Sequence, residues 1–278
     1  MRLAFLISKQ EVLKFNMAVL AQIQRQVVER QWFLTWPDTL SMLLHPLLKR
    51  AAGFLAILCV LAFMGELISG YAEYKDYITP ETSSWFRISK DRSLGEYAGY
   101  ILQELCIAFV LLAGIRLASP IHYVLAGFMQ FICLDDAFQF HEQLGEILGA
   151  RYFMDGNVLR AQDLGELTYF IIVMAIGGLA LLVALLKSTR VQTSLFLMLL
   201  MPFVLAAGCA VGLDLLHASV PKSMRLLGGV VAAFEDTGEL VAFSSFLLLA
   251  TSQWMIIQHM SPRPLANRFP TGDLRQLD

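Results

Sequence analysis

Long apolar stretches dominate the chain between residues 51 and 258. Six of them reach the roughly 20 mostly apolar residues that a helix needs to cross a bilayer. They fall near residues 51–70, 97–118, 121–145, 166–187, 193–218 and 228–258. Only helices or closed barrels satisfy the backbone within lipid, and these runs are too long and unbroken for strands. The pattern predicts an all-α, polytopic integral membrane bundle of about six transmembrane helices.

The two ends of the chain differ from this transmembrane domain of residues 51–258. Within residues 1–50, apolar positions such as Leu13, Met17 and Leu20 recur at helical spacing among charged residues. This predicts an N-terminal amphipathic helix lying on the membrane surface. Residues 259–278 form a short tail. Lysine and arginine are more numerous on the side of both termini, which places the N- and C-termini in the cytoplasm.

The amino-acid composition supports the assignment as a membrane protein and limits the kinds of binding partner to expect. Hydrophobic residues make up 57% of the 278 residues and charged residues only 16%, against about 25% in a typical soluble protein. The formal net charge of −2 gives no reason to expect nucleic acid as a partner. The expected partners are membrane lipid and an apolar small molecule, while the oligomeric state is left open.

Acidic residues and histidines gather at one end of the predicted helices. Antiparallel neighbours place these residues at opposite ends of their sequences, which brings them to the same membrane depth, in the outer half. Such an arrangement is improbable by random scatter. The candidate metal ligands are Glu104, Asp135, Asp136, His141, Glu142, Asp214, His217, Glu235 and Glu239.

Helical spacing places most of these residues on shared faces. Asp135, Gln139, Glu142 and Glu146 follow one stripe of the third crossing. His141 lies about 100° from Glu142, so it joins the stripe only if the helix loosens there. Asp214 and His217, three residues apart, share a face of the fifth crossing.

The sixth and fourth crossings differ in polarity. Glu235 and Glu239 share a face of the sixth crossing, because they are four residues apart. The fourth crossing is free of charge from Leu167 to Leu186, so we expect it at the periphery of the bundle. Glu66 lies near the end of the first crossing, where we expect it to be solvated.

Charge balance then raises the question of what neutralises these acids. An ionised acid at the centre of a bilayer costs about 2.5–3.5 kcal/mol on insertion scales. No lysine or arginine stands between Arg116 and Arg151 or between Arg225 and Arg263, so pairing within those helices is excluded. Carboxylates with imidazoles are typical ligands of iron and zinc. The sequence therefore predicts a divalent metal, iron or zinc, and leaves open whether one or two ions bind.

These observations favour a membrane metalloenzyme that acts on a lipid, a quinone or another apolar substrate from the outer half of the membrane. Both metal-dependent hydrolysis and di-iron oxidation are compatible with the ligands. A proton- or metal-coupled transporter is the alternative, although a transporter needs a polar route through both halves of the membrane. An accessory subunit of a membrane complex is the third reading.

Two acidic segments carry a resemblance. The strings LDDAFQFHEQLGE, at residues 134–146, and FEDTGE, at residues 234–239, resemble segments of uncharacterised bacterial multi-pass proteins. The resemblance implies no particular activity. The expected location is a bacterial inner membrane.

Overall fold

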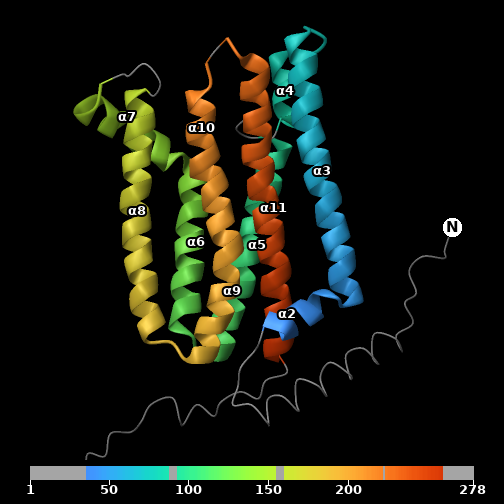
Figure 1. Ribbon diagram of the computed structural model, residues 1–278, viewed down its shortest axis with the longest axis vertical. Helices are drawn as coiled ribbons and strands as arrows, with labels where there is room; N and C mark the ends of the chain where they lie inside the picture. Colours follow the sequence, from blue (N-terminus) through green and yellow to red (C-terminus); the bar gives the residue numbers. More distant parts are fainter. Residues whose placement is uncertain (1–35, 88–92, 155–159, 222, 259–278) are drawn as a thin grey trace, which may run out of the picture.

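The protein is an all-helical bundle over the part of the chain that the structure, a computed structural model, describes: residues 36–87, 93–154, 160–221 and 223–258 (Figure 1). The elements run in the following order: α2 (Trp36–Leu43), α3 (Pro46–Tyr74), α4 (Pro80–Phe86), α5 (Leu94–Leu117), α6 (Pro120–Phe138), α7 (Phe140–Tyr152), α8 (Ala161–Leu186), α9 (Arg190–Ala207), the π-helix η1 (Gly208–Leu213), α10 (Asp214–Ser219) and α11 (Arg225–Gln258).

The prediction of six long apolar helices is confirmed. Six helical segments are long and apolar enough to cross a membrane, which is compatible with an integral membrane protein. The predicted amphipathic helix of residues 1–50 and the tail of residues 259–278 lie wholly or largely outside the described residues. The six segments are Pro46–Tyr74, Leu94–Leu117, Pro120–Phe138, Ala161–Leu186, Arg190–Ser219 and Leu226–Gln258.

The helix α11 is the centre of the bundle. It packs against α3, α5, α9 and η1, while α6 packs against α5, α8 and α9. Figure 1 shows α3 and α8 at opposite edges of this arrangement. Fully buried side chains such as Phe246, Leu125 and Val110 fill the apolar interior. All four cysteines are buried and free, as expected for small residues between helices.

One end of the bundle, here called the acidic end, is where α3, α6 and α10 finish and α5, α8 and α11 begin. Figure 1 shows it at the top, together with α4 and α7. The acids predicted to share one membrane depth lie toward this end, because consecutive crossings run in opposite directions.

The third crossing is shorter than the sequence indicates, and the expected continuous stripe through Asp135, Gln139 and Glu142 is wrong. The helix α6 ends at Phe138, and Gln139 adopts a left-handed conformation with φ 54° and ψ 39°. A new helix, α7, starts at Phe140. A non-glycine residue with positive φ breaks the helical path. The bend therefore changes which residues can face Asp135.

The helix α7 lies extremely close to the start of α8. A Cβ added at Gly165 would stand only 2.0 Å from the Gly145 carbonyl oxygen and 2.7 Å from the Gly149 nitrogen. Only residues without a side chain permit such an approach of two backbones. The three glycines thus fix α7 against α8 and determine where the bend at Gln139 places the following residues.

The fifth crossing changes its winding before it reaches the acidic end. α9 passes through Pro202 and continues into the π-helix η1 and then α10. Proline removes a backbone donor, and π-helical turns insert a residue into a helix. Cys209 of η1 packs so closely on α11 that a Cβ at Gly238 would meet its sulfur at 2.6 Å. This contact positions α10 beside the start of α11.

Candidate metal centre

Asp214, His217 and Glu235 form a group whose ligand atoms can serve one metal ion. One ligand atom from each residue lies within 4.8 Å of the other two. The His217 Nδ1 atom is 3.7 Å from Glu235 Oε2. The Glu235 side chain is 15% exposed and that of His217 is 44% exposed, so the group opens to the surface on the imidazole side. Among the described residues, this is the one group that meets the distance condition.

Local helix geometry explains the convergence of the three residues. Asp214 is the first residue of α10, and His217 follows three residues later on the same face. Glu235 comes from the third turn of α11, which packs against both η1 and α10. The predicted face-sharing of Asp214 and His217 and their approach to Glu235 are present in the fold.

A second polar unit joins α6, α7 and α8. The Tyr169 hydroxyl donates a hydrogen bond of 2.6 Å to Asp135 Oδ1, and His141 Nδ1 lies 3.2 Å from Asp135 Oδ2. Burial of the His141 ring opposes its protonation, but the hydrogen bond and negative charge of Asp135 outweigh this effect and raise the pKa of His141 above its usual value. His141 therefore meets Asp135 because the helix breaks between them.

The remaining acids of α11, Asp236 and Glu239, lie within electrostatic range of Asp136 of α6. Asp236 and Glu239 both interact electrostatically with Asp136 and with Asp214. The Asp236 Oδ2 atom is buried and has no hydrogen-bond partner within the described part of the chain. These acids lie within electrostatic range of Asp214, so they are further oxygen donors in the neighbourhood of the candidate group.

Six predicted ligands lie outside the three-residue group: Asp135, Asp136, His141 and Glu239, described above, and Glu104 and Glu142. Glu104 is exposed on α5 and accepts a hydrogen bond of 2.7 Å from Gln130 Nε2 of α6. Glu142 of α7 accepts one of 3.3 Å from Gln139 Nε2. Both side chains thus have neighbouring amide donors.

Glu66 is not solvated, contrary to the expectation from its position near a helix end. Its residue is only 2% exposed, and Arg87 pairs with it at 2.9 Å. Arg87 also lies 3.2 Å from Glu73 Oε2. This arginine follows α4, so a cation from a connecting segment neutralises an acid inside the bundle.

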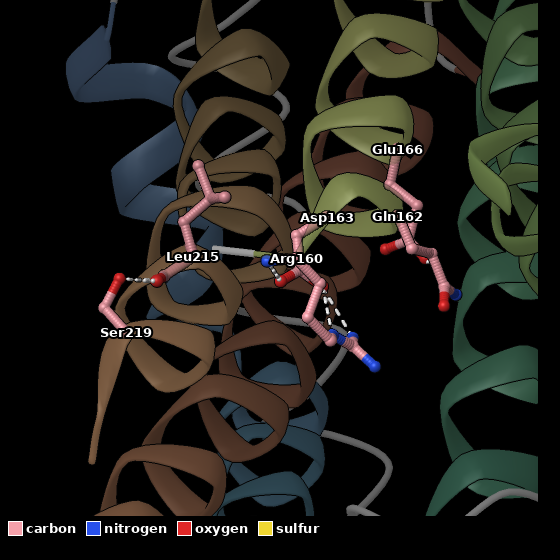
Figure 2. Close-up of polar contacts among 6 residues, drawn as sticks. All are labelled: Arg160, Gln162, Asp163, Glu166, Leu215 and Ser219. Carbon is pink, nitrogen blue, oxygen red and sulfur yellow. Dashed lines mark hydrogen bonds and ion pairs between the residues drawn. The ribbon is translucent and has the colours of Figure 1, made fainter. Parts of the chain in front are cut away.

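The helix α8 is not purely apolar at the acidic end, because it begins at Ala161 and carries acids in its first turns. The Arg160 side chain and backbone nitrogen both bond to the buried Asp163, and Gln162 Nε2 donates to Glu166 Oε1 at 2.8 Å (Figure 2). Asp214 interacts electrostatically with both Arg160 and Asp163. The helix α8 lies at an edge of the bundle, as expected, but its first turns, before Leu167, contribute polar side chains to the acidic end.

Figure 2 also shows the end of α10, where the Ser219 hydroxyl donates a bond of 2.7 Å to the Leu215 carbonyl oxygen. This bond spans the last turn of α10, which contains His217. It satisfies the serine hydroxyl within the helix.

Comparison with protein families places the whole candidate centre in one domain. Residues 51–254 match a family described as a domain of unknown function, DUF8692. The chain belongs to this family. The DUF8692 region begins just after Arg50 and includes the helices that supply Asp214, His217 and Glu235. No curated protein and no solved structure matches the chain.

Sequence reasoning missed three residues of the acidic end of this DUF8692 protein. Tyr169 stands in an apolar run and carries no charge, so nothing in its neighbourhood distinguishes it from a membrane-facing aromatic. Arg87 is distant in sequence from Glu66. Asp163 stands shortly before the apolar run of α8. Its position could have indicated the start of that helix, because an acid in the first turn of a helix is favourable.

Proposed function

We propose that this protein holds a divalent transition metal through Asp214, His217 and Glu235 and uses it in chemistry on an apolar, membrane-dissolved substrate. The single observation that supports the proposal is the approach of the three ligand atoms to within 4.8 Å of one another. Two carboxylates and an imidazole suit iron and zinc. Asp236 and Glu239 interact electrostatically with Asp214 and are further carboxyl groups in the neighbourhood of the site.

Openness of the group favours an enzyme over a purely structural metal site. Structural zinc sites have four protein ligands, whereas catalytic sites keep a position for water or substrate. The half-exposed His217 imidazole leaves one side of the group open to water or substrate, which matches the second arrangement. A bound metal of this kind acidifies a coordinated water or polarises a substrate oxygen. Zinc would point to hydrolysis and iron to oxidation of a lipid or quinone.

The proposed site lies in the outer half of the membrane. With both termini in the cytoplasm of a bacterial inner membrane, the acidic end lies in the outer half of the membrane. Substrates would then enter from the outer leaflet. Residues at this end that face outward, such as Leu216 and Leu226, are exposed apolar side chains suited to contact with lipid.

Metal analysis of purified protein tests the proposal. We expect close to one iron or zinc ion per chain, because the group provides ligands for one ion. Asp214→Asn and His217→Gln should each remove most of it, since each deletes one of three ligands. Glu146→Gln, an exposed acid on α7, is the matched control and should retain the metal. Absence of metal from the wild-type protein after growth with both metals, together with no binding on titration, contradicts the proposal.

A transporter is the second candidate, and one observation favours it. Ser244, Ser252 and Gln253 are buried along α11 on the far side of Glu239 from the acidic end. They provide polar atoms in a half of the bundle where described charged residues are sparse. Metal or proton flux into liposomes that is lost in Glu239→Gln supports transport, whereas metal retention without flux favours the enzyme.

A further inference from the structure

His141 has the surroundings of a metal-binding histidine, although it stands outside the three-residue group. Its Nδ1 atom faces the carboxylate of Asp135, which is 4% exposed and accepts a second hydrogen bond from Tyr169. An ionised carboxylate only accepts hydrogen bonds, so the proton of a neutral imidazole is placed on Nδ1. The lone pair of Nε2 is thereby left available. Metal-bound histidines are typically oriented by a carboxylate in this way.

The ring is held on its other sides as well. Its centroid lies 5.4 Å from that of Phe170 on α8, and Tyr169, the next residue along the chain, orders Asp135. The glycine contacts between α7 and α8 fix the helix that carries His141. Side chains of α6 and α8 and the close packing of α7 therefore determine the position of the His141 imidazole. A histidine without a function at the surface does not need so many contacts.

His141 also lies within electrostatic range of the candidate group. The charge of His141 interacts with that of Asp214, one of the three candidate ligands, and with Glu166 at the start of α8. Coordination requires the Nε2 atom to approach Asp214 more closely when the metal binds. The hydrogen bond to Asp135 acts at Nδ1, so it can persist during this movement. The left-handed residue Gln139 provides the bend that carries the ring.

We propose that His141 is the fourth protein ligand of the metal, through Nε2, and that Asp135 and Tyr169 are its hydrogen-bonded positioning residues. This inference rests on the proposed function, because it concerns the metal held by Asp214, His217 and Glu235. It assigns Asp135 to the support of a ligand and not to the metal itself. The resulting set of two imidazoles and two carboxylates favours iron and zinc over magnesium and calcium, which prefer oxygen ligands alone. Water or substrate would then take a fifth position, an expansion that catalytic zinc sites allow.

Zinc titration of the metal-free full-length protein in detergent, in competition with a chromophoric chelator, tests this inference. We expect Asp135→Asn to weaken zinc binding by about 10–100-fold, as changes in outer-shell partners do. His141→Gln should weaken it at least as much, because it removes the ligand itself. Tyr169→Phe should have the smallest effect of the three. Tyr152→Phe, an exposed tyrosine of α7, is the control and should bind zinc as the wild type does.

X-ray absorption at the zinc edge distinguishes a ligand from a residue that only maintains the fold. The wild-type site should show two imidazoles, and His141→Gln, loaded with zinc above its dissociation constant, should show one. Two imidazoles retained in His141→Gln, with unchanged affinity, overturn the inference while leaving the proposed function intact. If every variant, including Asp214→Asn, binds zinc as the wild type does, both this inference and the proposed function are rejected. If His141→Gln does not fold, Asp135→Asn decides: wild-type affinity in that variant overturns the inference.

Discussion

Replacing Arg87 by methionine is expected to lower the free energy of unfolding by about 3–5 kcal/mol, the effect of removing one partner from a buried ion pair. The Arg87 Nε and Nη2 atoms both lie 2.9 Å from Glu66 Oε1, and the Glu66 residue is 2% exposed. Methionine retains the apolar length of the side chain and deletes the charge. The Glu66 carboxylate would then remain buried without its principal cation, and desolvated charge is costly.

Equilibrium unfolding in mixed detergent micelles measures this loss, with Arg151→Met as the control. Arg151 is exposed and lies over the Tyr152 ring, so its removal should cost little. A second variant separates charge from packing. Adding Glu66→Gln to Arg87→Met should recover part of the lost stability, because the isolated charge is gone. A single variant as stable as the control, or a double variant no more stable than Arg87→Met, contradicts this account.

The same pair shows where prediction from sequence ends. Length and hydrophobicity are local properties, and they identified the six long helices because each helix must satisfy its own backbone in lipid. The pairing of Glu66 with Arg87 is not local. It depends on a turn after Tyr74 and on the short helix α4, which together return the chain to the end of α3. The hydrophobic pattern does not show that the chain turns back toward the end of α3.

The candidate site was predictable to a similar extent. Helical periodicity correctly placed Asp214 beside His217, since three residues make nearly one turn. It could not place His141, because its position depends on the left-handed conformation of Gln139, a residue type that also fits a continuous helix. The role of Tyr169 could not be predicted for another reason. Its hydroxyl is identifiable as a partner of Asp135 only when α6 and α8 are side by side.

Substituting Gly165 by alanine is expected to be the second most damaging single change, with a loss of stability of about 3 kcal/mol, the upper part of the range for overpacking. The new methyl group would meet the Gly145 carbonyl oxygen at 2.0 Å and the Gly149 nitrogen at 2.7 Å. Both are backbone atoms, so no side chain can rotate away. The helices α7 and α8 must separate, and the contact between His141 and Phe170 must lengthen with them.

Gly178→Ala on the same helix is the matched control, because a Cβ at Gly178 has nothing within 4 Å. Alanine favours a helix over glycine by up to about 1 kcal/mol, so this variant should unfold no more easily than the wild type. Thermal unfolding of both variants in detergent makes the comparison. Equal stability of the two would mean that α7 and α8 do not approach as closely as their glycines allow. If instead Gly165→Ala alone is destabilised, its zinc affinity should fall as well, because the displaced α7 carries His141 away from Asp135.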